Sequence, residues 1–257
     1  MSVILKERID SILLITLNRP EVLNAFNNEM FEELENSLKE VEEDKSIRAI
    51  IITGNGKAFA SGGDLNEIKE LNFETGMRKA RKAQKLFDYI ENFPKPIIAA
   101  INGYALGGGL ELAIACHLRI ASENAKLGQP EINIGIIPGF GGTQRLPRLI
   151  GKTLAFEMIL SGKPITAQRA YEIGLINRVV KSEELINQAK EFAQLLAEKP
   201  PIAIKCAIES INSGIDAPLE EGMKIEASLF GICCSTYDKN EGINAFLEKR
   251  KPIFKGE

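Results

Sequence analysis

Two glutamates in apolar, glycine-rich surroundings are the residues of this chain best suited to chemistry. Glu111 ends the segment GGGLE at residues 107–111, and Glu131 ends the segment LGQPE at residues 127–131. A carboxylate in an apolar stretch costs free energy unless it is paired or used. Because glycine lets a ligand come close to the backbone, we interpret both glutamates as candidates for general acid–base catalysis.

Each glutamate also has a purely structural explanation. Glu111 lies about one helical turn after Gly107, where an acid stabilises the dipole of a helix that begins there. Its neighbours are apolar, however, and do not resemble a solvated helix face. Glu131, taken alone, is typical of an exposed acid in a loop.

Two glycine turns offer backbone donors. Residues 107–109 are three glycines that predict the start of a helix, whose free N–H groups can face a developing negative charge. The segment KAFASGGD at residues 57–64 enters a second helix, with Asp64 as its N-cap. Either turn alone is explained equally well as a tight structural turn. Two such turns after parallel strands can face one cleft, which favours a shared site.

Three other kinds of site fail on spacing or on partners. A GxGxxG dinucleotide turn needs Gly or Ala where Leu112 stands, and a P-loop needs Lys-Ser/Thr after its glycines. A triad built on Ser61 would need His117, the only histidine, which is better explained as structural. The cysteines form no CxxC pair, so we expect neither metal nor disulfide, with Cys233 and Cys234 filling the core at a helix end.

Charge and hydropathy exclude several partners. The net charge of -3 and the pI near 5.6 provide no basic field for nucleic acid. The longest apolar stretches are far too short to span a membrane. The first ten residues carry charges where a signal peptide needs an apolar core, which predicts a cytoplasmic protein.

Apolar periodicity predicts an α/β architecture. Because short strands alternate with long connections, we expect parallel pairing, after a first hairpin with a charged turn at residues 7–11. The expected elements are strands at residues 3–6, 12–17, 49–53, 96–101 and 118–121, and helices at residues 27–43, 73–93 and 107–116.

From residue 182 onward the pattern becomes wholly helical. Such a tail after an α/β core indicates a lid or an oligomerisation element. The adjacent prolines 200 and 201 suggest a boundary, which gives a core at residues 1–199 and a helical region at residues 200–257. The helices are expected at residues 182–198, 201–212, 218–234 and 238–248.

Six motifs in chain order give the sequence a family resemblance. The chain resembles the enoyl-CoA hydratase/isomerase (crotonase) family over its full length. The matching motifs are LNRPEVLNAFN at 17–27, AFASGGD at 58–64, AAINGYALGGGLELA at 99–113, GQPE at 128–131, IPGFGGTQRL at 137–146 and AFLEKRKP at 245–252.

The resemblance implies a fold and a ligand. The expected fold is a spiral of ββα repeats followed by C-terminal helices that form trimers, which pair into hexamers. The ligand is an acyl-CoA thioester, so coenzyme A belongs to the substrate and no separate cofactor or metal is expected. Its developing oxyanion would lie between the N–H groups of Gly63 and Gly108, each worth about 3–4 kcal/mol of barrier.

Both glutamates together imply a hydratase. Hydratases of the family carry both, whereas isomerases and decarboxylases usually lack the one matching Glu111. The implied reaction adds water to a 2-trans-enoyl-CoA to give a 3-hydroxyacyl-CoA, with Glu111 deprotonating the water and Glu131 delivering a proton to C2. Hydratases and dehydratases of 3-hydroxybutyryl-, methylglutaconyl- or carnitinyl-CoA and an isomerase remain alternatives. An RNA-binding, non-enzymatic member is disfavoured by the acidic charge.

The resemblance also implies substrate contacts, with two departures from the family pattern. Val22 stands where many members have lysine, so a phosphate contact is missing or replaced. Cys234 stands where many have a phenylalanine that lines the acyl pocket, which leaves the preferred chain length open. The implied contacts are Val22, Leu23, Ala25, Ser61, Asp64, Leu65, Leu106, Pro130, Phe246 and Lys249, the last two near a subunit boundary.

Overall fold

The computed structural model describes residues 2–257 and contains two β-sheets. The larger sheet has the order β1-β2-β3-β5-β7-β10 and is parallel except at β1–β2. The smaller sheet has the order β4-β6-β8-β9 and is parallel except at β8–β9. The strands are β1 Ile4–Ile9, β2 Ile12–Leu17, β3 Ala49–Gly54, β4 Ala58–Ala60, β5 Ile97–Ile101, β6 Tyr104–Leu106, β7 Leu118–Ser122, β8 Lys126–Gly128, β9 Ile165–Thr166 and β10 Arg178–Val180.

Successive strands alternate between the two sheets. β3 is followed by β4, β5 by β6 and β7 by β8, and after each pair the chain enters a helical segment. Because each pair is joined by a very short connection, the second strand must start a new sheet beside the first. This repeated ββα turn is a spiral, and it confirms the predicted fold class.

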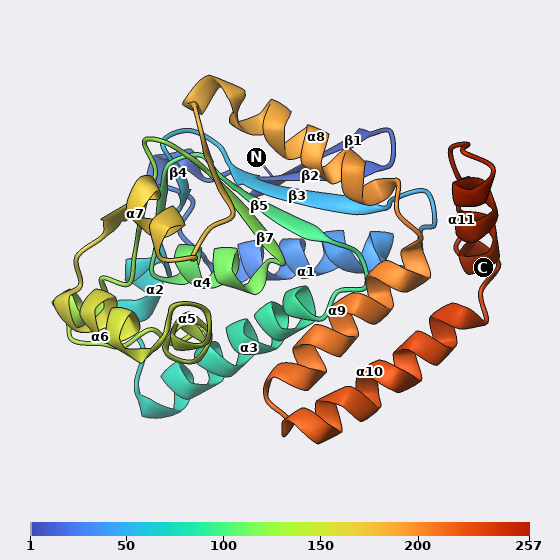
Figure 1. Ribbon diagram of the computed structural model, residues 1–257. Helices are drawn as coiled ribbons and strands as arrows, with labels where there is room; N and C mark the ends of the chain where they lie inside the picture. The colour runs from blue at the N-terminus through green and yellow to red at the C-terminus, as the bar shows by residue number, and fades with distance from the viewer. Residues whose placement is uncertain (1) are drawn as a thin grey trace.

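Helices cover both faces of the larger sheet, as a parallel sheet requires. Ile50 and Ile52 of β3 belong to a core shared with Leu34 and Phe87, whereas Ile51 faces the opposite core, shared with α8. Figure 1 shows α8 on one side of this sheet and α1, α3 and α4 on the other. The helices are α1 Asn28–Glu42, α2 Leu65–Lys69, α3 Phe73–Glu91, α4 Gly108–Ala115, α5 Gly142–Ile150, α6 Lys152–Ser161, α7 Ala167–Glu172, α8 Leu185–Ala197, α9 Pro201–Ile215, α10 Leu219–Cys234 and α11 Tyr237–Leu247, with short 3-10 turns at η1 Pro20–Val22, η2 Glu131–Ile134 and η3 Ser182–Glu184.

Side-chain caps set the starts of the long helices. Asn27 accepts the N–H of Met30 at the start of α1. Asn72 and Thr75 form a reciprocal capping box at the start of α3. Such caps satisfy backbone donors that a helix end leaves free, and both helices were predicted with nearly these bounds.

The C-terminal helices extend away from the sheets. In Figure 1, α9 passes beside α3, and α10 and α11 lie at the edge of the molecule. Several of their large apolar side chains are exposed, which is costly in water. They include Ile211, Ile215, Leu219, Phe230 and Phe246.

The four predicted helices correspond to α8–α11, while the boundary at residue 200 stays a prediction. Within residues 2–257, no helix has the length and apolar character needed to cross a membrane.

Two predictions need correction. Residues 7–9 continue β1, and the hairpin turns at Asp10, whose φ is 49°. The charges at residues 7 and 8 indicated a turn, but they lie on an edge strand, where charged side chains are common. Cys234 is exposed and Cys233 is only half-buried, so this pair does not fill the core. The small sheet and α5–α7 were not predicted.

Candidate active site

Two adjoining cavities lie where the glycine turns meet. The inner cavity, of about 300 Å³, is lined by both candidate glutamates, by Gly63 and Gly108, and by apolar side chains. The outer one, of about 450 Å³, shares Gly63 and Glu131 with it. Its other lining residues include Val22, Ala25, Ser61, Asp64, Leu65 and Pro130.

Two glycines bring α4 against β4 at this point. Gly107 has a φ of 52°, and a Cβ there would lie 2.8 Å from Oε1 of Glu131. A Cβ on Gly109 would lie 2.0 Å from the carbonyl oxygen of Ala60. Glycine at both positions therefore lets the helix begin directly at the cavity wall.

The backbone N–H groups of Gly63 and Gly108 are free donors. Among residues 2–257, neither donates a hydrogen bond, whereas the N–H of Asp64, the next residue after Gly63, donates to the carbonyl oxygen of Phe26. Gly108 is the first residue of α4, whose orphan N–H groups carry the positive end of the helix dipole. Both glycines line the inner cavity, so two unpaired donors are available to a ligand there.

Glu111 is buried and hydrogen-bonded. The residue is 1% exposed. Its Oε1 accepts hydrogen bonds from the N–H groups of Phe140, at 2.8 Å, and Gly142, at 2.7 Å. Burial raises its pKa to about 8, and the nearby Glu131 raises it too, although the two N–H groups lower it. A carboxyl group with such a pKa can hold or release a proton near neutral pH.

Glu131 begins η2 and is half-buried rather than surface-exposed. Burial raises its pKa to about 7. The amide of Gln129, which is fully buried, can donate to both carboxylate oxygens, at 3.0 Å and 3.1 Å. Gln129 therefore fixes the direction in which Glu131 faces.

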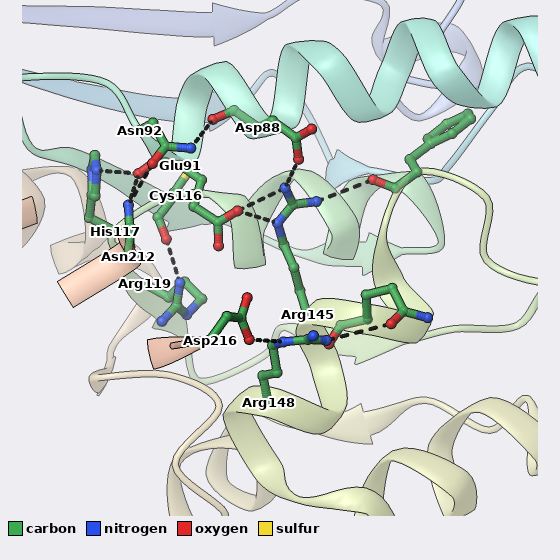
Figure 2. A network of polar contacts seen from close by, with 12 residues as sticks. Asp88, Glu91, Asn92, Cys116, His117, Arg119, Arg145, Arg148, Asn212 and Asp216 are labelled. Atoms are coloured by element: carbon green, nitrogen blue, oxygen red, sulfur yellow. Dashed lines mark hydrogen bonds and ion pairs between the residues drawn. The ribbon is translucent and has the colours of Figure 1, made fainter. Parts of the chain in front are cut away.

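Arg145 anchors the turn that holds Glu111. It bonds Asp88 at 2.5 Å and Glu91 at 2.8 Å on α3, and its third contact is the carbonyl oxygen of Phe140 at 3.4 Å. Figure 2 shows the guanidinium group between the two acids. Because Phe140 also donates to Glu111, Arg145 ties the position of the carboxylate to α3.

A second clamp holds the glycine turn at residues 61–64. Asp64 caps α2 through the N–H of Asn66 and pairs with Arg19 at 3.0 Å. Arg19 also bonds the carbonyl oxygen of Ala25. The buried Asn24 donates to the carbonyl of Ala58, on β4. The segment at 22–25 is thereby fixed beside the glycine turn at residues 61–64.

The alternative triad does not form. Both ring nitrogens of His117 form hydrogen bonds. Nδ1 accepts the N–H of Ile97, and Nε2 pairs with the carbonyl oxygen of Glu91, a contact that Figure 2 shows. Burial lowers its pKa to about 4. Ser61 faces the carbonyl of Val22 instead. The interpretation of His117 as structural is confirmed.

Four predicted contacts lie outside the lining of both cavities. Leu23 and Leu106 are close in sequence to lining residues but do not line either cavity. Phe246 and Lys249 belong to the end of the chain around α11, which Figure 1 shows far from α2 and α4. A contact made by these two residues across a subunit boundary stays a prediction.

Three residues that hold the site in place were not predicted from the sequence. They are Asn24, Gln129 and Arg145, and all three lie in the quoted motifs.

The chain is thus an α/β spiral that brings one buried carboxyl group, one half-buried carboxyl group and two free backbone donors to one cavity, an arrangement suited to acid–base chemistry at a carbonyl compound. The family model described as "Enoyl-CoA hydratase/isomerase" matches residues 7–257, and the chain belongs to this family. The resemblance predicted from the motifs is thereby confirmed.

Individual members of the family are similar to this chain over nearly its whole length. The chain is 43% identical to the short-chain-enoyl-CoA hydratase of Clostridium acetobutylicum, in an alignment that covers 96% of this chain and 95% of the relative. It is 44% identical to the 2,3-dehydroadipyl-CoA hydratase of Escherichia coli, covering 100% of each. A crystal structure of enoyl-CoA hydratase from Bacillus anthracis matches with a TM-score of 0.96 at 42% identity, covering 99% of this chain and 100% of that one.

Proposed function

We propose that the protein is an enoyl-CoA hydratase, which adds water reversibly to a 2-trans-enoyl-CoA and gives a 3-hydroxyacyl-CoA. The observation that carries this proposal is the meeting of Glu111 and Glu131 with the free N–H groups of Gly63 and Gly108 around one cavity. Hydration of crotonyl-CoA, followed by loss of the enoyl-thioester absorbance, tests it.

The backbone donors activate the thioester. With the thioester oxygen between the N–H groups of Gly63 and Gly108, electron density moves toward that oxygen and C3 becomes electrophilic. The donors are held in place before the reaction and stabilise the enolate that forms, with an effect of about 3–4 kcal/mol for each.

The two glutamates supply and accept protons. The water oxygen attacks C3, its proton passes to Glu111, and the proton on Glu131 passes to C2 of the enolate. With pKa values of about 8 and about 7, the pair holds about one proton between pH 7 and pH 8. Two N–H groups face Oε1 of Glu111 and stabilise its charged form, so we place the base there. Because the pKa of Glu111 is the higher of the two, the reactive arrangement, with Glu111 ionised and Glu131 protonated, is the minor one of the two singly protonated forms.

The outer cavity is proposed to hold the coenzyme A part of the substrate. It shares Gly63 and Glu131 with the inner cavity, and Gly62 and Gly107 of the two glycine turns also line it. Val22 brings no cation to it, so phosphate contacts must come from elsewhere. The reaction uses no cofactor in this proposal, since the chemistry is proton transfer between substrate, water and two carboxyl groups.

The acyl group is the open part of the proposal. Since one relative is named a short-chain-enoyl-CoA hydratase and another a 2,3-dehydroadipyl-CoA hydratase, both aliphatic and acidic acyl groups are candidates. An isomerase is the weaker candidate, because that reaction moves a proton between carbons and needs no second carboxyl group to activate water.

We also propose a homotrimer or a hexamer formed by two trimers. The exposed apolar side chains on α9–α11 support it, because such side chains gain stability when a partner covers them. Light scattering by the purified protein measures the mass of the particle. A monomer at micromolar concentration would contradict this assembly.

We expect a bell-shaped pH profile for kcat/KM, with limbs near pH 7 and pH 8. Below the lower pKa both carboxyl groups are protonated and no base is left; above the higher pKa both are ionised and no acid is left. Initial rates with crotonyl-CoA from pH 5 to pH 10 measure it, with viscosity controls for substrate binding. A flat profile across this range would remove the paired acid–base assignment.

We expect Arg145→Lys to lower kcat by at least about tenfold, because small misplacements of catalytic groups are costly. Lysine cannot bond Asp88, Glu91 and the Phe140 carbonyl together, so the turn that holds Glu111 shifts. Arg148→Lys is the matched control on the same helix, since Arg148 pairs with Asp216 in an exposed position, as Figure 2 also shows. Equal rates for the two variants would contradict this role.

A further inference from the structure

A partly buried ion pair places one of its residues, Lys79, in the wall of the cavity that holds the two glutamates. Nζ of Lys79 on α3 lies 2.5 Å from Oε2 of Glu67 on α2, and the side chains are 9% and 32% exposed. Oε1 of Glu67 also accepts the N–H of Asn28 at 3.3 Å. Lys79 lies 5.7 Å from the centroid of the Phe31 ring. The pair is therefore fixed on several sides.

This pair separates two cavities. Lys79 and Leu71 line both the inner cavity and a groove of about 590 Å³ on the outside of α2 and α3, whereas Glu67 lines only the groove. The remaining inner wall from these helices is small or apolar, with Ile68, Gly76 and Ala80. Lys79 and Leu71 are thus the partition between the acid–base cavity and the groove.

The proposed position of the substrate brings the acyl tail toward this partition. With the thioester oxygen at Gly63 and Gly108 and coenzyme A in the outer cavity, the carbon chain beyond C3 continues into the inner cavity. A chain that reaches Lys79 meets a cation already neutralised by Glu67. Parting the pair leaves the ammonium group of Lys79, whose side chain is 9% exposed, without its partner. This is costly, so the wall resists a longer chain.

We propose that the Lys79–Glu67 ion pair closes the acyl cavity and restricts the enzyme to short acyl chains. This inference rests on the proposed function. Removing Lys79 joins the inner cavity to the groove, and the acyl tail gains a path out between α2 and α3. The pair is thus a specificity determinant that takes no part in the proton transfers.

Lys79→Ala tests the closure with crotonyl-, octenoyl- and dodecenoyl-CoA. We expect the ratio of kcat/KM for dodecenoyl-CoA to kcat/KM for crotonyl-CoA to rise at least tenfold, since each buried methylene contributes roughly fourfold. Glu67→Ala should shift the chain-length preference in the same direction, and it replaces Lys79→Ala in the test if that variant does not fold. Lys39→Ala is the control, because it removes an exposed pair of the same length, with Glu35.

Two results would overturn the proposal. One is an unchanged order of preference for chain length in both variants. The other is a wild-type preference for an enoyl-CoA with a terminal carboxylate, over the monocarboxylic analogue of equal length, that Lys79→Ala abolishes; Lys79 would then be a carboxylate receptor. Titration calorimetry with butyryl- and dodecanoyl-CoA measures the same shift in binding, so the closure is tested even if the wild type does not hydrate crotonyl-CoA.

Discussion

Glu111→Gln and Glu131→Gln each lower kcat for hydration of crotonyl-CoA by at least about 10²–10⁴, the usual contribution of one general acid or base. Glutamine keeps the size of the side chain and most of its contacts but neither accepts a proton from water nor delivers one to C2. Each variant should also lose one limb of the pH profile. Steady-state rates with wild-type protein prepared in parallel measure both effects.

Stability measurements separate this loss from unfolding. The folded pKa of Glu111, about 8, lies above its ordinary value of 4.5, so the folded protein binds the proton more tightly than the unfolded chain does. This carboxyl group therefore destabilises the fold increasingly as the pH rises from 4.5 to 8. Glu111→Gln should melt no lower than the wild type at pH 8. Full activity in both variants would contradict the assignment of both residues.

Gly109→Ala is the second change with a large expected effect. The new Cβ would lie 2.0 Å from the carbonyl oxygen of Ala60 and 2.6 Å from its carbon, so α4 must move away from β4. Overpacking of this kind costs about 1–3 kcal/mol, and about 2–4 °C in Tm is expected for each kcal/mol in a chain of this size. The shift also moves Glu111 and the N–H of Gly108, so we expect kcat to fall about 10²-fold.

Gly231→Ala is the matched control for this substitution. Gly231 is an exposed glycine inside α10, and no atom lies within 4 Å of an added Cβ. Alanine in a helix is favoured over glycine by roughly 0.5–1 kcal/mol. Calorimetric scans and rates of both variants distinguish the close approach of α4 from a general effect of adding a methyl group. Similar behaviour of the two would contradict the packing argument.

The long elements were predictable because their signals are local. Asn27 and Asn72 cap α1 and α3 where the apolar period begins, and β3 is an apolar run between polar turns. The small sheet was not predictable, because β4, β6 and β8 each have three residues and β9 has two. So short a strand shows no period of its own, and only pairing with its neighbours defines it.

The candidate site divides in the same way. Glu111 was suggested by its sequence because an acid among apolar residues is conspicuous. Arg145 and Lys79 were not, because each lies on an amphipathic helix among other charged residues, where the sequence indicates a solvated face. Arg145 is buried because α5 packs against α3, and Lys79 is buried because α3 packs against α2. Such contacts between helices are not encoded in any local sequence pattern.

Incubation of the wild-type protein with crotonyl-CoA in D₂O is the most direct test of the proposed activity. We predict 3-hydroxybutyryl-CoA as the product, with one deuterium at C2 and the water oxygen at C3, formed at a rate that Glu111→Gln and Glu131→Gln both reduce. Mass spectrometry and proton NMR identify the product. Free coenzyme A or a shifted double bond in place of the hydroxyl group would contradict the assignment as a hydratase.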